Sequence, residues 1–144
     1  MDKNIKFINY KKKNLAIIIK SQYKSNKTKF FTPNSYSQQL GVLNFKTNHK
    51  IIPHYHKKIT RVINFTRETL IIKSGVVRVD FYEKSNKYIK STILRKGDVI
   101  LLVQGGHGFK ILKKATIIEI KQGPYNSNTD KIRFLKSENK KIKS

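Results

Sequence analysis

Short runs of β-branched and apolar residues, separated at close intervals by turn-forming residues, restrict the fold of this chain more than any other feature. From residue 39 onward the runs cover residues 40–45, 51–56, 69–73, 76–82, 88–94, 99–103, 109–112 and 115–121. Predicted turns such as Ser74-Gly75, Lys96-Gly97, Gly105-Gly106 and Lys113-Lys114 lie between them. Many short strands at this spacing, without an apolar period of 3.6 residues, predict an all-β antiparallel sandwich or small barrel.

Three parts follow from this pattern. Residues 1–38 are polar and basic, with one apolar run, Leu15 to Ile19, that could form an edge strand. Residues 39–125 carry the predicted barrel. Residues 126–144 form a Lys-rich tail in which Ile132, Phe134 and Leu135 could make one docked helical turn. A chain of 144 residues is expected to form a single domain with its own core.

Two absences restrict the chemistry and the location. The chain has no Cys, so any bound metal must be held by nitrogen and oxygen atoms. The longest apolar runs, Leu15 to Ile19 and Val99 to Val103, are far shorter than the ~20 residues that span a bilayer. The sequence therefore predicts a cytoplasmic protein with no membrane partner.

The formal net charge of +24 raises the alternative of a basic nucleic-acid-binding protein. The composition disfavours this alternative, because 27 of the 32 basic residues are Lys and only 5 are Arg, the residue that reads guanine and clamps phosphate. The basic residues are also scattered, with no aromatic-basic platform of the kind that single-strand binders use. We expect no specific nucleic-acid partner.

A pattern of histidines and one carboxylate indicates a metal site. His54 and His56 are two apart on a predicted strand, which places both imidazoles on one face. Glu68 and His107 follow on later predicted strands and would complete a four-ligand set. The chain has only 4 His and 8 acidic residues, and three of the four His fall in this pattern.

These residues resemble the two motifs of the cupin superfamily, and in particular its small single-domain bacterial members. The first motif matches His54-Tyr55-His56, Glu68 and Gly75; the second matches Gly97-Asp98 and Gly105-Gly106-His107. The chain departs from the motifs at Asn48, where Gly is usual, at Val103, where Pro is usual, and in the eleven-residue gap between His56 and Glu68. The resemblance implies an antiparallel double-stranded β-helix, also described as a jelly-roll barrel.

The resemblance also implies a function with alternatives. A divalent transition metal (Fe, Mn, Ni, Co or Zn) held by His54, His56, Glu68 and His107 would act on a small polar, carbohydrate-derived substrate, by isomerase, epimerase, lyase or dioxygenase chemistry. The same site in a non-catalytic protein would bind a small-molecule ligand. Arg61, in the loop between ligands, is the cation expected at the mouth of the site. Small cupins are often homodimers, and an N-terminal strand could be exchanged between copies.

Strand alternation adds one expectation about the interior. If Glu68 and His107 face the barrel interior, Leu70 and Ile72 face inward on one strand, as do Phe109 and Ile111 on the other. The result would be an apolar cup around a polar base. Asp98, next to Gly97, is interpreted as a turn cap and not as a ligand.

Overall fold

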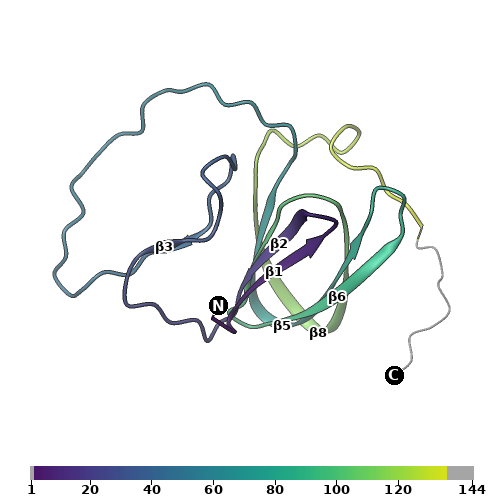
Figure 1. Cartoon of the computed structure of the whole chain (residues 1–144), viewed down its shortest axis with the longest axis horizontal. Helices are drawn as coiled ribbons and strands as arrows, with labels where there is room; N and C mark the ends of the chain where they lie inside the picture. Colours follow the sequence, from purple (N-terminus) through teal and green to yellow (C-terminus); the bar gives the residue numbers. More distant parts are fainter. Residues whose placement is uncertain (1, 136–144) are drawn as a thin grey trace.

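Eight antiparallel strands make up the computed structural model, which describes residues 2–135 (Figure 1). They are β1 (Ile5–Tyr10), β2 (Lys13–Ile19), β3 (Lys29–Phe30), β4 (Gly41–Val42), β5 (Glu68–Tyr82), β6 (Tyr88–Arg95), β7 (Val99–Leu102) and β8 (Gly106–Lys121). The order β1-β2-β7-β5-β6, with β8 also paired to β5, gives one six-stranded curled sheet, and β3 pairs with β4. The described residues contain no helix, so the all-β antiparallel prediction is confirmed.

Strand β5 joins two walls of the curled sheet. Its residues 68–71 pair with β7, its residues 76–82 pair with β6, and β8 runs along its whole opposite edge. Strands β1, β2 and β7 therefore belong to one wall and β6 to the other. Figure 1 shows the sheet curling so that these walls face each other.

Both long strands pass through positions that the sequence suggested were chain reversals. The register of β5 and β8 shifts on each side of Ser74, and Gly75 has a φ of 86°. A Cβ atom on Gly75 would lie 2.2 Å from the carbonyl oxygen of Lys114. The prediction of turns at Ser74-Gly75 and Lys113-Lys114 is wrong, because Gly at this φ makes a bulge that bends the strands and does not end them.

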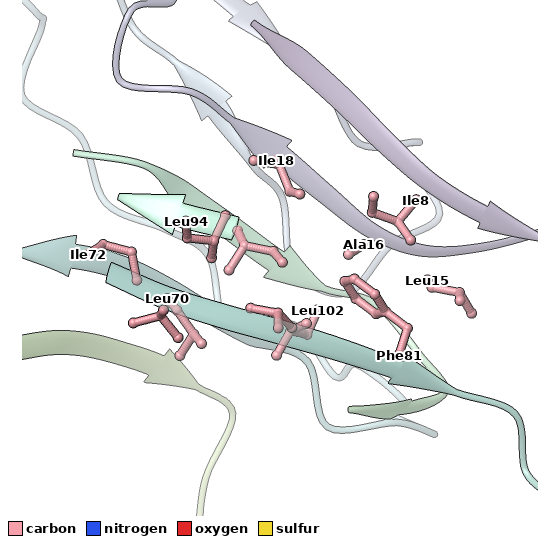
Figure 2. Close-up of a cluster of buried hydrophobic side chains, with 12 residues drawn as sticks. Ile8, Leu15, Ala16, Ile18, Leu70, Ile72, Phe81, Leu94 and Leu102 are labelled. Carbon is pink, nitrogen blue, oxygen red and sulfur yellow. The ribbon is translucent and has the colours of Figure 1, made fainter. Parts of the chain in front are cut away.

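Twelve buried side chains fill the space between the two walls (Figure 2). They come from β1, β2, β5, β6 and β7. They are Ile8, Leu15, Ala16, Ile18, Leu70, Ile72, Val77, Val79, Phe81, Leu94, Ile100 and Leu102. Leu70 and Ile72 face inward as alternation predicted.

The N-terminal residues form an interior part of the sheet. Strand β2 lies between β1 and β7, so the prediction that Leu15 to Ile19 form an edge strand is wrong. Strand β1 was not predicted, because polar residues interrupt its apolar ones. The turn that joins it to β2 is made by Lys11 and Lys12, with φ values of 44° and 60°, where Gly or Asn is the usual signal.

Residues 43–67 contain no strand. The predicted strand over 40–45 is reduced to Gly41–Val42, and the predicted strand over 51–56 is not present. β-branched residues form a strand only where a neighbouring strand completes their hydrogen bonds, and Pro53 also lacks an N–H group. The segment instead makes a wide arc away from the curled sheet (Figure 1). We call residues 43–66 the arm.

Asp98 ties the start of β7 to the end of β6 and to the residues that follow β2. Its buried carboxylate accepts hydrogen bonds from the backbone N–H groups of Ser21 (2.9 Å) and Arg95 (2.8 Å), and it pairs with Lys20. The interpretation of Asp98 as a turn cap is confirmed. A separate observation is that no helix among residues 2–135 has the length and apolar character needed to cross a membrane.

Candidate functional site

The side chains of Glu68 and His107 meet on the concave side of the curled sheet. Glu68 is the first residue of β5 and is buried, and His107 is the second residue of β8. His107 Nε2 lies 3.1 Å from Glu68 Oε2. This contact joins two of the four residues that the sequence proposed as metal ligands.

His107 holds the pKa of Glu68 at about 2 through this hydrogen bond, against the opposing effect of burial. The ammonium groups of Lys131 and Lys121, whose Nζ atoms lie 3.7 and 4.0 Å from Glu68 Oε1, lower the pKa further. Glu68 is therefore an anion at neutral pH and can only accept hydrogen bonds. It follows that His107 Nε2 carries the proton of this hydrogen bond.

A cavity of about 1060 Å³ opens beside this pair, between β5, β8 and the residues that follow β8. Its aromatic lining is formed by Phe65, Tyr82, Phe109, Tyr125 and Phe134. Its charged lining is formed by Glu68, His107, Glu119, Lys121, Asp130, Lys131 and Arg133. Charged and aromatic groups converging on one concavity are typical of a small-molecule site.

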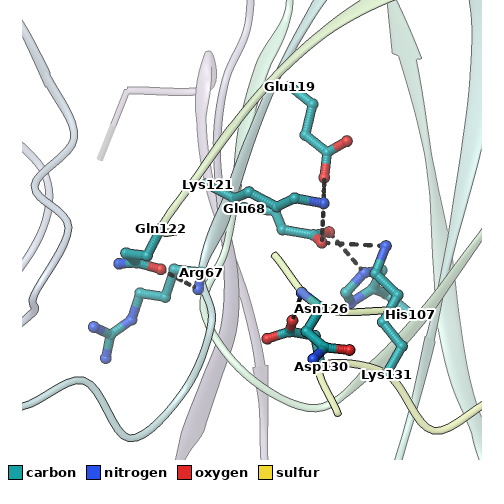
Figure 3. Close-up of polar contacts among 9 residues, drawn as sticks. All are labelled: Arg67, Glu68, His107, Glu119, Lys121, Gln122, Asn126, Asp130 and Lys131. Carbon is teal, nitrogen blue, oxygen red and sulfur yellow. Dashed lines mark hydrogen bonds and ion pairs between the residues drawn. The ribbon is translucent and has the colours of Figure 1, made fainter. Parts of the chain in front are cut away.

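Part of the C-terminal segment, residues 122–135, lines one side of the cavity, through Tyr125 and residues 129–134. Figure 3 shows Asp130 and Lys131 of this segment beside Glu68 and His107. A turn closes on Asp130, whose carboxylate accepts a hydrogen bond from the backbone N–H of Asn126. Lys131, next in sequence, reaches Glu68, and the Phe134 ring packs edge-on against Tyr82 at 5.3 Å between centroids. The expected helical turn over Ile132 to Leu135 is not present. Residues 136–144 of the predicted tail lie outside the described residues.

Tyr125 lies between two cations of the site. Lys121 Nζ is 4.3 Å and Lys131 Nζ is 5.6 Å from the centre of the Tyr125 ring. Lys121 is also 3.0 Å from Glu119, and this hydrogen bond raises the pKa of Lys121. No sequence motif marked these residues. Strand alternation was the available signal for Glu119 and Lys121, because it places both side chains on the same face of β8 as Ile117. On the ladder of β5 and β8 they are opposite Leu70 and Glu68.

His54 and His56 lie in the exposed arm and not beside Glu68. Their rings contact each other edge to face at 5.3 Å, and His54 Nδ1 is 2.9 Å from the carbonyl oxygen of Ile52. The i, i+2 spacing on a strand was the basis for placing both imidazoles on one barrel face. That basis is absent here because the arm forms no strand.

The described residues do not assemble the proposed metal centre within one chain. Among residues 2–135, no three His, Cys, Asp or Glu side chains are grouped so as to hold a metal ion. The oxygen atoms of Glu68 also face His107 and two lysine ammonium groups, which would repel a divalent cation. A four-ligand site needs both histidines of the arm to reach this pair.

Arg61, the expected substrate-binding cation, is exposed in the arm and does not line the cavity. A nearby arginine, Arg67, has a structural role. Its guanidinium stacks 4.4 Å from the centre of the Tyr36 ring and donates a hydrogen bond to Ser37 at 2.6 Å. These contacts anchor the end of the arm to the connection between β3 and β4.

No protein-family model matches this chain, and neither the curated proteins nor the solved structures that were searched contain a match.

Proposed function

We propose that the protein binds a small polar ligand in the cavity beside Glu68 and His107, and that its curled sheet is a cupin-type double-stranded β-helix. The observation that carries the proposal is the buried, hydrogen-bonded Glu68 and His107 pair at the wall of a cavity of about 1060 Å³. A buried carboxylate is costly unless it is paired, and here its partners all face a space large enough for a ligand.

A carbohydrate-derived ligand suits the lining. Carboxylates at Glu68, Glu119 and Asp130 accept hydrogen bonds from hydroxyl groups, and ammonium groups at Lys121 and Lys131 donate to ring and carbonyl oxygens. The faces of aromatic rings such as Tyr125 offer apolar surface to the C–H side of a sugar ring. Lysines near the pair further favour a sugar that carries a carboxylate or phosphate group.

Proton transfer is the catalytic form of this function that the geometry supports. Because Nε2 of His107 donates to Glu68, Nδ1 is the nitrogen that is left to accept a proton whenever the ring is neutral. It makes no hydrogen bond to another described residue. An imidazole oriented by a carboxylate can take a proton at its other nitrogen, as isomerisation or epimerisation next to a carbonyl requires.

Metal-dependent chemistry is the second candidate function. The observation in its favour is that the arm holding His54 and His56 leads through Arg67 into Glu68, and its last residues, including Asn64 and Phe65, line the cavity. A bound transition metal would supply Lewis-acid or dioxygen chemistry. This candidate requires the two arm histidines to lie beside Glu68 and His107.

Ligand-observed nuclear magnetic resonance and thermal shift with neutral monosaccharides, uronic acids, sugar phosphates and nucleotide sugars test the proposal. We expect binding by the wild type and a loss of at least tenfold in affinity in Glu68→Gln. The matched control is Glu83→Gln, which removes an ion-paired carboxylate from outside this cavity and should bind as the wild type does. Equal affinity in both variants would place the ligand elsewhere.

A further inference from the structure

The arm exposes more apolar surface than a monomer normally tolerates. Nine large apolar side chains in it are between 45% and 99% exposed, and Ile52, Tyr55 and Val62 are at least 80% exposed. They are Leu43, Phe45, Ile51, Ile52, Tyr55, Ile59, Val62, Ile63 and Phe65. So many exposed apolar side chains in one segment indicate an interaction surface.

A second uncovered surface lies on the concave side of β8. Phe109 and Ile111 pair across the ladder with Val79 and Val77, which are fully buried, so all four side chains share the core-facing side. Phe109 and Ile111 are nevertheless 43% and 51% exposed. Among the described strands, β8 pairs only with β5, so its other edge has free backbone N–H and C=O groups. The 16-residue strand thus has one edge without a neighbouring strand and a concave face without a full cover.

We propose that the arm of one copy docks as a strand along β8 of a second copy, and that the two copies exchange arms around a two-fold axis. Each chain carries an undocked arm and a β8 strand with one unpaired edge. A two-fold symmetric dimer places each arm on the β8 strand of the other copy, and so covers both arms and both strands. The arm has the β-branched composition of a strand. In the single chain it extends away from the sheet and does not lie along its own β8 (Figure 1).

Size and apolar character favour a second copy as the occupant. Covering nine such side chains would bury several hundred Å² per copy, comparable to the roughly 800 Å² per partner of a stable interface. The exposed apolar side chains of the arm match the exposed apolar side chains of β8, Phe109 and Ile111, that the same chain leaves uncovered.

Arm exchange would also complete the site. The partner's His54 and His56 would enter the cavity next to Glu68 and His107, although the same residues of one chain are apart. This second step rests on the proposed function of the cavity, whereas the exchange of arms does not.

Mass measurement by light scattering during size-exclusion chromatography tests the exchange. We expect a dimer for the wild type, and a monomer with unchanged circular dichroism for the double variant Ile52→Asp, Val62→Asp. Leu135→Asp is the matched control, since Leu135 is 93% exposed and lies outside the arm and the cavity lining; it should stay dimeric. A monomeric wild type, or a double variant that remains a dimer, overturns the proposal.

Cysteine trapping separates exchange from an arm that folds back on its own chain. The native chain has no Cys, so two single variants, Ile52→Cys and Ile111→Cys, can be mixed and treated with a short bismaleimide. We expect covalent heterodimers from this pair and none when Lys87→Cys, in the exposed turn between β5 and β6, replaces Ile111→Cys. A third variant carries both Ile52→Cys and Ile111→Cys in one chain. If this chain cross-links internally while the mixture of single variants gives no heterodimer, the proposal is overturned.

Complementation tests the shared site. Two double variants are needed. One carries His54→Ala and His56→Ala in the arm, and the other carries Glu68→Gln and His107→Asn in the cavity. Each alone is expected to lose retention of Co²⁺ or Ni²⁺, measured by metal analysis. Their mixture is expected to regain it, because a mixed dimer contains one intact combination. A dimer without such recovery overturns the shared metal site but leaves the arm exchange standing. If the wild type is an arm-exchanged dimer and the mixture regains metal, but the wild type binds no sugar, only the proposed function is contradicted.

Discussion

Glu68 and His107 are 39 residues apart in sequence and lie at opposite ends of the ladder of β5 and β8, yet their side chains are hydrogen bonded at 3.1 Å. On the ladder of β5 and β8, Glu68 is opposite Lys121 and His107 is opposite Phe81. Only the bend of both strands brings the two ends together across the concave side. The position of the site therefore depends on the curvature of the sheet, which the bulge at Gly75 supplies.

The Glu68 carboxylate should make stability depend on pH. Its pKa is about 2 in the folded protein and 4.5 when unperturbed, so the unfolded state binds more protons between these values. Its contribution is fully present above about pH 4.5 and is lost as the pH falls towards 2. We expect Glu68→Gln to lower the free energy of unfolding by on the order of 1–2 kcal/mol at pH 6. Urea unfolding of both proteins at pH 6 and pH 3 should show this difference shrinking.

Replacing Gly75 should destabilise the fold through the bulge. Gly75→Ala places a Cβ 2.2 Å from a backbone oxygen at a φ of 86°, and we expect a cost of about 2 kcal/mol or more. Gly108→Ala is the matched control. Its Cβ would meet Tyr82 at an ordinary contact distance of 3.7 Å, so urea midpoints should move little. Equal effects of the two substitutions would show that backbone conformation at residue 75 does not limit stability.

Asp98 is expected to be the most sensitive polar residue of the described chain. Asp98→Ala leaves the partly buried Lys20 without its carboxylate and removes the acceptor for two backbone N–H groups. Loss of one partner of a buried ion pair costs about 3–5 kcal/mol. Thermal unfolding should show a fall in midpoint that Asp2→Ala, at an exposed carboxylate, does not reproduce.

The high positive charge should produce only weak DNA binding. Scattered lysines neutralise phosphates without reading bases, so affinity should be independent of sequence and fall steeply with salt. Fluorescence anisotropy with two unrelated duplexes at 50 and 200 mM salt is the measurement. Tight binding to one duplex at the higher concentration would support the nucleic-acid alternative.

The strand pattern from residue 68 onward was predictable because alternation and β-branched runs are local properties. The runs at 88–94 and 99–103 became β6 and β7 to within a residue. Gly75 was ambiguous, since a positive φ serves a turn and a bulge equally well, and only the partner strand decides between them. The hairpin of β1 and β2 could not be recognised because its turn uses Lys11 and Lys12.

The candidate site was partly predictable for a related reason. Glu68 and His107 lie on strands whose order and alternation were legible, and the structure brings them together. His54 and His56 were placed by assuming a strand, and a strand depends on a neighbour that the local sequence does not specify. Lys131 and Phe134 lie in a segment without periodicity, so their approach to Glu68 and Tyr82 is visible only in three dimensions.

The passage of β5 from one wall to the other has a consequence for how the protein opens. Strand β5 is hydrogen bonded to β7, β6 and β8. Neither wall can therefore separate without breaking backbone hydrogen bonds of β5, the strand that both walls share. The described sheet should therefore behave as one cooperative unit. In native-state hydrogen exchange, we expect the amides of Ile18 on β2 and Leu94 on β6 to share one opening free energy and one dependence on denaturant.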